Sequence, residues 1–565
     1  MNAAIYYHPE AYTTSGPRLM GRNAAGESFL KGYLKYSKAT EFWVQVQKNE
    51  HTQHFANAVK AMGRTELVKS VDLNNLAALS QSGLVYYPGP GIAEHVYHRA
   101  LIGTSASAAN SPNPHAAWSL CGITHTTSSA GAMDAIGNLI TAPVQAWDAV
   151  ICTSHAVKDN VQRLLQAKVN QLQERLGITK LVLPMLPVIP LGIHTQDFQF
   201  TEKQKQEAKT KVGANAQTLV VLYMGRLSFH AKAHPLAMYQ ALQKAAVAVA
   251  ATGQKIKLVE CGWHANESIA KSYQAAAQIA CPDVQVLTLD GRSAEARNTA
   301  WACADVFCSL SDNIQETFGI VPIEAMAAGL PVVVSDWDGY KDTVRHGIDG
   351  FRVPTCMPEA GFATDLAYRH AVGADTYDMY CGLTSSLVSV DIEATAQAFV
   401  QLFESANLRH TMGASGHLRA KETYDWSVII GQYEALWQEQ KKIRTEALQT
   451  AHVAQSQFAW PERLDPFFAF ASYPTQTLSA QTNVCLTDVS AKVAIERVHN
   501  YKQMAMVSYA HFIMPFNAEI EQLLLRLETQ PQTAEMLVEN FEAARKPLLM
   551  RSLVWLLKLG ILRLA

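Results

Sequence analysis

The sequence lacks several features that would place it in a specialised class of protein. Its nine cysteines include no CxxC pair, so reduced, buried thiols are expected rather than disulfides or a zinc site. No run approaches the roughly 20 apolar residues that a membrane span requires. Residues 1–12 show no basic segment followed by an apolar one, as a signal peptide would. We therefore expect a soluble, cytoplasmic protein, which leaves attachment to a membrane surface open.

An excess of charge of one sign is also absent. The formal net charge is −2 and the pI is about 6.8, so nothing indicates a nucleic-acid partner. Hydrophobic residues make up 48% and charged residues 17% of the chain, which argues against disorder and supports sizeable cores. The 565 residues are enough for about three or four domains.

Two series of short apolar runs, each separated by helical patterns, predict two parallel, doubly wound sheets. In the first series, a helix is expected over 27–36 and strands at 4–7, 83–87, 118–125, 149–153 and 181–187. The second series has strands at 219–224, 256–261, 284–289, 305–309 and 331–335. Its runs are almost continuously apolar, which is typical of strands buried on both faces.

The pattern along the chain predicts four segments. They are a Rossmann-like domain over 1–195, a second over 196–445 with an insertion at about 357–388, a linker over 446–486, and a module over 487–565. In the module, Asn517 and Thr533 are expected to cap two helices, and Pro547 to begin a third that ends at Gly560. Three helices followed by a strand at 561–564 resemble a winged-helix module, an α+β extension.

The most informative stretch is 312–331, DNIQETFGIVPIEAMAAGLP. Glu316 and Glu324 are separated by seven residues, with Glu316 before a glycine turn and Glu324 on the helix that follows. The N-terminus of such a helix presents free N–H groups and a positive dipole end, which suit a phosphate. Carboxylates at the two ends of this element can accept hydrogen bonds from hydroxyls of a sugar and a ribose.

A second element runs from an apolar strand into Gly225 and two cations. Arg226 can fork onto two phosphate oxygens, and Lys232 supplies a point charge. These cations can therefore bind phosphate oxygens, while the paired glutamates can accept from hydroxyls.

These motifs resemble retaining glycosyltransferases of the GT-B fold, in particular glycosyltransferase family 4. The glutamate pair, the intervening Phe318-Gly319 and the following EAMAAGLPVV all match, and the cations match a GRL…K motif. The resemblance covers roughly residues 1–440. It implies that the first domain binds the acceptor, that the second binds the donor, and that the last helix of the second packs back on the first.

The resemblance also implies the site residues. Those acting on the transferred sugar or on the leaving diphosphate are Glu316, His125, Arg226 and Lys232. Those binding the donor are Gly26, Gly225, Gly262, Gly291, Arg292, Thr317, Phe318, Gly319, Ile320 and Glu324. Within this set, Gly26 belongs to a glycine loop at 21–26, between the first strand and the first helix, that lets backbone approach the donor.

The implied reaction is sugar transfer with retention from a nucleoside-diphosphate sugar, with a UDP-sugar favoured, to an unidentified acceptor. Arg226, Lys232 and the N–H groups near Gly319 would stabilise charge on the leaving diphosphate, so no metal or other cofactor is expected. Glu316 would hold the sugar and Glu324 the ribose. Two alternatives stay open, a GT-B nucleotide-sugar epimerase and a non-catalytic nucleotide-sugar-binding protein.

The tail is open to two interpretations. Its last helix carries Arg551 and Lys558 among Leu, Val and Trp, which is too apolar for a DNA-reading helix. It could pack on the transferase core or on a second copy in a homodimer, or it could recruit a peptide or protein acceptor.

Overall fold

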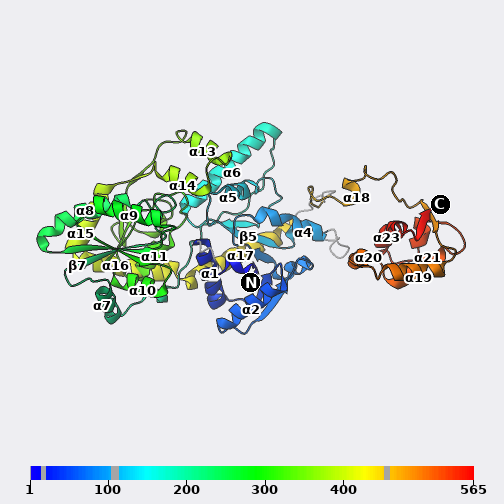
Figure 1. Cartoon of the computed structure of the whole chain (residues 1–565), viewed down its shortest axis with the longest axis horizontal. Coiled ribbons are helices and arrows are strands. Elements are labelled where there is room, and N and C mark those ends of the chain that lie inside the picture. Colours follow the sequence, from blue (N-terminus) through cyan, green and yellow to red (C-terminus); the bar gives the residue numbers. More distant parts are fainter. Residues whose placement is uncertain (1, 14–20, 104–112, 451–458) are drawn as a thin grey trace. The chain divides into compact units, whose positions relative to one another are not determined.

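The computed structural model describes residues 2–13, 21–103, 113–450 and 459–565 of the chain. These form two compact units, residues 1–455 and 456–565, drawn from blue to yellow and from orange to red in Figure 1. The larger unit contains two α/β domains, and the smaller unit contains the tail. The expected fold class, two doubly wound domains, is therefore confirmed.

The first sheet has six parallel strands in the order β3-β2-β1-β4-β5-β6. They are β1 Ala4–Tyr6, β2 Glu41–Gln45, β3 Leu67–Val71, β4 Leu84–Tyr86, β5 Ser119–Ile123 and β6 Ala149–Ile151. Every residue of β4, β5 and β6 is buried, as expected for parallel strands with both faces covered. This strand order is that of a Rossmann-like fold.

The strand prediction for this domain was wrong in two respects. Strands β2 and β3 were missed, although the run Glu-Phe-Trp-Val-Gln of β2 carries the aromatic and β-branched residues that favour strands. The expected strand at 181–187 forms only isolated bridges, such as the one between Met185 and Ala149. Pro184 and Pro187 lack the N–H groups that a continuous ladder needs.

The second sheet repeats the topology, with six parallel strands in the order β12-β11-β10-β7-β8-β9. They are β7 Thr218–Met224, β8 Lys255–Gly262, β9 Gln285–Asp290, β10 Val306–Ser309, β11 Val332–Ser335 and β12 Gly350–Val353. The first five were predicted, and β12 was missed. The strand order reverses between β7 and β10, and ligands of such sheets bind beyond the carboxyl ends of the strands at this point.

Helices connect the strands of both domains. In the first domain they are α1 Gly21–Tyr36, α2 Asn49–Ala61, α3 Leu79–Ser82, α4 Val96–Gly103, α5 Ala130–Gly137 and α6 His155–Leu176. In the second they are α7 Glu202–Lys211, α8 Leu236–Val249, α9 Glu267–Ala280, α10 Ala294–Cys303, α11 Ile320–Ala327, α12 Tyr340–Thr343, α15 Ile392–Glu404 and α16 Ala406–Arg419.

Helix α1 begins six residues earlier than expected, so Gly26 lies inside the helix and not in a loop before it. A Cβ at Gly26 would overlap the carbonyl oxygen of Ala11, because the short turn Pro9–Ala11 rests on the helix there. Close packing is the physical reason for this glycine, and the expectation of a glycine loop was wrong. Part of the preceding segment, residues 14–20, lies outside the described residues.

The last helix of the second domain, α17 (Trp426–Thr450), packs back on the first domain as expected. The Trp426 ring lies so close to Gly32 of α1 and to Gly192 that a Cβ at either position would come within 2.6 Å of it. Further along the helix, Glu434 accepts hydrogen bonds from the Ser37 hydroxyl at 3.0 Å and from the N–H of Lys38 at 2.8 Å. The two domains are thus joined through one buried helix face.

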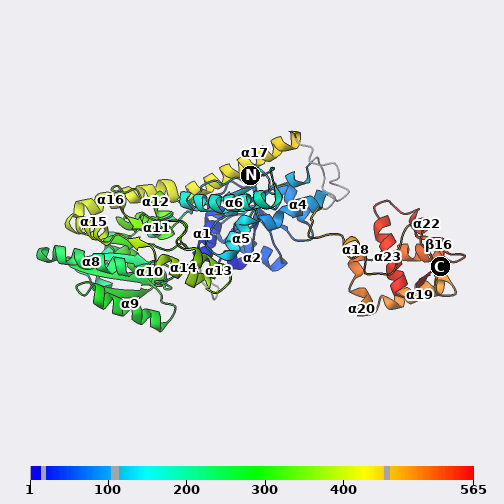
Figure 2. The same ribbon diagram turned by 90° about the horizontal axis from the view of Figure 1, so that it is seen from above.

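The insertion expected at 357–388 is more regular than the sequence suggested. It contains two short helices, α13 (Thr364–Ala371) and α14 (Tyr377–Ser385). Strands β13 (Thr355–Cys356) and β14 (Ser389–Val390) pair antiparallel at its base. In Figures 1 and 2, both helices lie beside α5 of the first domain.

The smaller unit has a three-stranded antiparallel sheet in the order β16-β15-β17, packed against helices. Its elements are α18 Pro466–Ala469, β15 Asn483–Leu486, α19 Ala491–Tyr501, α20 Ala505–Ser508, α21 Asn517–Arg526, β16 Gln532–Thr533, α22 Ala534–Val538, α23 Lys546–Lys558 and β17 Leu562–Leu564. Strand β15 lies within the stretch expected as linker, so the folded module begins earlier than predicted.

The predicted helix starts in this unit are partly confirmed. The Thr533 hydroxyl accepts from the N–H of Met536, and Pro547 lies in the first turn of α23, both as expected. Asn517 does not cap α21; it is the first helical residue, and its side chain accepts from Lys502. The resemblance to a winged-helix module stays a prediction. No helix within the described ranges is long and apolar enough to span a membrane.

Candidate active site

Three glycines lie at the carboxyl ends of the neighbouring strands β7, β8 and β9. A Cβ at Gly262 would overlap the carbonyl oxygen of Gly225, and one at Gly291 would lie 2.9 Å from the Cα of Gly262. Two backbone hydrogen bonds of 3.0 Å, from Gly225 to Cys261 and from Gly291 to Gly262, hold the three turns together. The glycines at 262 and 291 therefore let the three turns pack directly on one another, which brings the carboxyl ends of β7, β8 and β9 close together.

The two predicted cations lie on the loop that follows this edge. Arg226 donates to the carbonyl of Ala231 at 3.2 Å, which folds the loop back on itself. The ammonium of Lys232 lies 3.5 Å from a carboxylate oxygen of Glu316, and its side chain keeps 35% of its surface exposed. The structure therefore brings together a cation and a carboxylate that are far apart in the sequence, on two separate elements of the second domain.

The turn Glu316–Gly319 is held by a neighbouring turn that follows β11. Gly319 has a left-handed φ of +78°, and a Cβ there would overlap the ring of Tyr340. A Cβ at Gly339 would in turn lie 2.5 Å from the Cα of Phe318. Because Gly319 is the N-cap of α11 and has no side chain, the first N–H groups of that helix, beginning at Ile320, face the turn without a side-chain cap.

Glu324 lies one turn into α11 and is partly buried. Burial raises the pKa of its carboxyl group to about 7, against a lowering by the nearby Arg297. Arg297 also donates to the carbonyl oxygens of Gly291, at 2.8 Å, and of Arg292, at 3.1 Å. This arginine ties the end of β9 to the environment of Glu324, and sequence reasoning missed it because a lone arginine in a helix carries no signal.

The first domain contacts the same turn from the opposite side. The Thr317 hydroxyl donates to the carbonyl oxygen of His125 at 3.2 Å, and the Ser154 hydroxyl donates to the carbonyl oxygen of Thr317 at 2.8 Å. Ser154 caps α6, where its oxygen also accepts from the N–H of Val157. The backbone of His125, which follows β5, is thereby placed next to the Glu316–Gly319 turn.

Arg292, which was expected to bind the donor, has its hydrogen-bonding groups engaged by a neighbouring residue. Its guanidinium group forks onto the carboxylate of Asp290 at 2.8–3.2 Å, and its N–H donates to the same carboxylate at 3.0 Å. Both groups are therefore engaged within their own turn.

Sequence reasoning also missed Asp338, which has a φ of +43° and is the one non-glycine residue with positive φ among the described residues. Burial, together with the charge of Glu316, raises its carboxyl pKa well above the usual range. The Ser154 hydroxyl lies 3.4 Å from this carboxyl group. A strained, buried acid beside the turn is a feature that functional sites often show, and no local sequence pattern predicts it.

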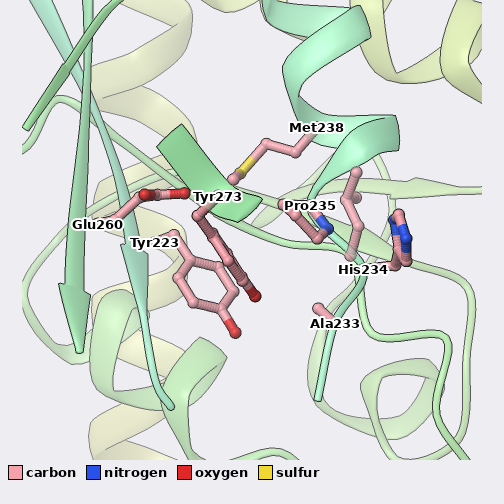
Figure 3. A pocket seen from close by; sticks show the side chains of 8 residues that line it. Tyr223, Ala233, His234, Pro235, Met238, Glu260 and Tyr273 are labelled. Carbon is pink, nitrogen blue, oxygen red and sulfur yellow. The ribbon is translucent and has the colours of Figure 1, made fainter. Parts of the chain in front are cut away.

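A small cavity lies behind the cation loop, between Tyr223, Tyr273 and Glu260 (Figure 3). Its volume of about 10 Å³ suits roughly one water molecule and is far too small for a sugar. Glu260 accepts from the Tyr239 hydroxyl at 2.6 Å, and burial raises the pKa of Glu260 to about 7. The cavity is therefore not the substrate site; the side chains that line it pack behind the cation loop.

Comparison with known proteins adds to this geometry. Residues 204–364 match a family model described as glycosyl transferases group 1. The second domain carries a glycosyltransferase group 1 domain. The matched stretch contains Arg226, Lys232, Glu316 and Glu324, so the prediction of a glycosyltransferase is confirmed for the domain that holds the candidate donor site.

Individual relatives match over shorter lengths. Phosphatidyl-myo-inositol mannosyltransferase of Mycobacterium leprae (strain TN) is 36% identical over 134 residues, which cover 24% of this chain and 26% of that protein. D-inositol 3-phosphate glycosyltransferase of Thermobispora bispora is 25% identical over 205 residues, 35% of this chain and 45% of that protein. The chain thus matches between about a quarter and a half of these relatives' lengths.

Among solved structures, Anabaena Alr3699/HepE in complex with UDP aligns with a TM-score of 0.48 and 15% identity, over 78% of this chain and 100% of that chain. A sucrose-phosphate synthase from Thermosynechococcus elongatus aligns with a TM-score of 0.43 and 16% identity, over 77% and 98%.

Proposed function

We propose that the protein transfers a sugar from a nucleoside-diphosphate sugar to an acceptor, with retention at the anomeric carbon, as a member of glycosyltransferase family 4. The observation that carries the proposal is the meeting of Lys232 and Glu316 at 3.5 Å, where Glu316 belongs to the turn that leads into the N-terminus of α11. A diphosphate needs cations and N–H donors, and a sugar needs hydrogen-bond acceptors. Both kinds of group stand here side by side.

The leaving diphosphate gains negative charge as the glycosidic bond breaks. Arg226 and Lys232 can neutralise that charge, and the free N–H groups at the start of α11 can donate to it. Lys232 keeps 35% of its side chain exposed, so its ammonium group is accessible to a phosphate. We propose that these groups suffice without a divalent metal.

Glu316 and Glu324 serve different parts of the donor in this proposal. Glu316, at the turn, accepts hydrogen bonds from sugar hydroxyls, and Glu324, one turn into α11, accepts from the ribose. His125 faces the sugar from the first domain, which supplies the acceptor side. A UDP-sugar is the favoured donor. The relatives named as mannosyl- and glycosyltransferases justify testing GDP-linked sugars in parallel.

Donor binding is tested by thermal shift and calorimetry with UDP, GDP, UDP-glucose and GDP-mannose. Replacing Lys232 by methionine should weaken binding of the preferred nucleotide about 10- to 100-fold, because a charge-assisted contact is lost. Lys244 is the matched control, since it forms a comparable exposed pair with Glu393 at 2.7 Å on the same domain. The Lys244→Met variant should bind within about twofold of the wild type. If no nucleotide or nucleotide sugar stabilises the wild type, the proposal is wrong.

Catalysis is tested with the Glu316→Gln variant, which should retain binding of the nucleotide while turnover falls; Glu393→Gln is the control. NMR can follow the release of the sugar to water, and the sugar that appears first should have the anomeric configuration of the donor. EDTA should not reduce the rate of this release. Formation of an epimer from the donor alone would favour an epimerase. Binding with no release or transfer to any acceptor would favour a binding protein.

For the tail we propose recruitment of a peptide or protein acceptor. Its loop region around α20 exposes several large apolar side chains, Met506 at 77%, Tyr509 at 74%, Phe512 at 77% and Phe516 at 69%. Contiguous exposed apolar groups of this size are typical of interaction surfaces. Deleting residues 456–565, which form a separate unit, should abolish transfer to the native acceptor but leave release of the sugar to water intact. Full activity of the truncated enzyme on that acceptor would exclude recruitment.

We also propose a cytoplasmic location, supported by nine free cysteines, of which only Cys356 is exposed.

A further inference from the structure

The insertion between β13 and β14 is fixed to the donor domain at its base. Thr355 of β13 pairs with Val390 of β14, and the Thr355 hydroxyl donates to the carbonyl oxygen of Asp336 at 3.1 Å. Helix α14 is capped by Thr376, whose hydroxyl accepts from the N–H of Met379. The insertion is therefore an ordered part of the donor domain and can hold another element in place.

The first residue of α14, Tyr377, reaches into the first domain. Its hydroxyl oxygen lies 3.0 Å from the hydroxyl oxygen of Ser128 and 3.3 Å from that of Thr126. Thr126 follows His125 directly, so this hydroxyl group ties the insertion to the loop of the first domain that carries His125.

The following turn of α14 contacts the cation loop. A Cβ at Gly382 would lie 2.9 Å from the Cβ of His230 and 3.1 Å from its carbonyl oxygen. That carbonyl oxygen also accepts from the side chain of Asn313 at 3.2 Å. Helix α14 thus extends from the loop after β5 to the loop that carries Lys232.

We propose that Tyr377 is a positioning residue for the reaction: its hydroxyl fixes the His125 loop of the first domain to the insertion, and so keeps the carbonyl oxygen of His125 in place to accept from Thr317 of the Glu316–Gly319 turn. The inference rests on the proposed function and adds to it an element, the insertion, that the matching motifs do not include. Tyr377 has no role in holding the diphosphate, which binds to the strand edges and α11. Its loss should therefore affect turnover and not nucleotide affinity.

The experiment compares Tyr377→Phe with Tyr380→Phe in the full-length protein. Tyr380 is on the same helix and is also partly buried, but its ring stacks on His370 within the insertion, with centroids 4.2 Å apart and an interplanar angle of 9°. Each variant removes one hydroxyl group and keeps the ring. Three quantities are measured. They are the hydrogen exchange of the amides of residues 124–133 without ligand, the kcat of sugar release from UDP-glucose or GDP-mannose, and the Kd for UDP or GDP.

Tyr377→Phe should raise exchange in 124–133 and lower kcat about three- to tenfold, as expected for hydrogen bonds of ordinary strength, with Kd changed less than about twofold. Tyr380→Phe should change neither. Should Tyr377→Phe fold poorly, Ser128→Ala removes the partner hydroxyl and should lower kcat by a similar factor.

Unchanged exchange or unchanged kcat in Tyr377→Phe would overturn the inference, as would equal effects of the two tyrosine variants. The exchange measurement needs no ligand. Failure of the wild type to bind any nucleotide would therefore count against the proposed function. The contact made by Tyr377 would still be tested by the hydrogen exchange of residues 124–133.

Discussion

Replacing Gly319 by alanine should destabilise the turn that carries Glu316. The backbone at Gly319 has φ of +78°, which an alanine adopts only at a cost. Its Cβ would also overlap the ring of Tyr340, a side chain that is only 2% exposed and whose hydroxyl oxygen lies 2.9 Å from that of Ser309. Tyr340 has no room to move aside without losing this contact.

The size of the effect follows from these two costs. A left-handed backbone costs an alanine about 1–2 kcal/mol, and overpacking a tight site costs about 1–3 kcal/mol. A substitution at Gly329, at the other end of α11, allows the two costs to be measured separately. Its φ is +77°, but no atom of the described residues lies within 4 Å of the Cβ position. Gly329→Ala should therefore show the backbone cost alone, and Gly319→Ala should lose about 1–3 kcal/mol more.

The assay is denaturant unfolding of the full chain, read at the transition of the larger unit, together with stabilisation by UDP or GDP. Gly329→Ala should keep the ligand-induced stabilisation, since it lies away from the turn. Gly319→Ala should lose most of it, because the N–H groups of α11 move with the turn. Equal losses of stability in the two variants would refute the overlap with Tyr340, and normal ligand stabilisation in Gly319→Ala would refute the placement of the phosphate site.

Three further predictions concern stability. Burial raises the pKa of Glu324 from 4.5 to about 7, so the folded state binds its proton more tightly than the unfolded chain and stability falls as the pH rises through this window. Glu324→Gln should reduce the slope of Tm against pH by the share of one titrating group, while Glu260 keeps its own share; an unchanged slope would contradict the assignment. Asp148 pairs with Arg99 at 2.8 Å, and both side chains are fully buried. Asp148→Ala should therefore lower the free energy of unfolding by about 3–5 kcal/mol, measured with denaturant. Glu202→Ala, whose pair with a lysine is exposed, should lower it by at most about 1 kcal/mol, and similar losses in the two variants would argue against the buried pair. Gly32→Ala should overlap the ring of Trp426 and lower the free energy of unfolding by about 1–3 kcal/mol, which thermal unfolding would detect as a lower Tm for the larger unit.

The strands of the second domain were predicted better from the sequence than those of the first domain, for a physical reason. Strands β7, β10 and β11 are buried on both faces and appear as continuous apolar runs, so their positions were readable. Strand β3 is mostly half-exposed and contains Lys69 and Ser70, so it offers neither an apolar run nor a clean alternation. The early start of α1 was hidden because glycines at 21 and 26 suggested a loop, although Gly26 is needed for packing against Ala11.

The candidate site divides in the same way. Glycines, cations and glutamates at fixed spacing within one element were visible in the sequence. Contacts between different elements were not visible in the sequence. Tyr377 and Thr126 are 251 positions apart, and the pattern around Tyr377 suggested only an irregular insertion. Asp338 was missed because its importance lies in a strained backbone and a buried carboxyl group, which have no sequence signature.

Thr317 connects donor binding to the contact between the two domains. Its carbonyl oxygen accepts from Ser154, and its hydroxyl donates to the carbonyl oxygen of His125, so both groups are held by the first domain. Its neighbours Glu316 and Gly319 belong to the proposed sugar and phosphate sites. A donor that stabilises one conformation of the turn therefore also favours these interdomain hydrogen bonds, because the same backbone segment carries the proposed donor contacts and the hydrogen-bonding groups of Thr317. The first domain and the donor should consequently bind this turn cooperatively, and water would be excluded from the sugar only when the two are in place together.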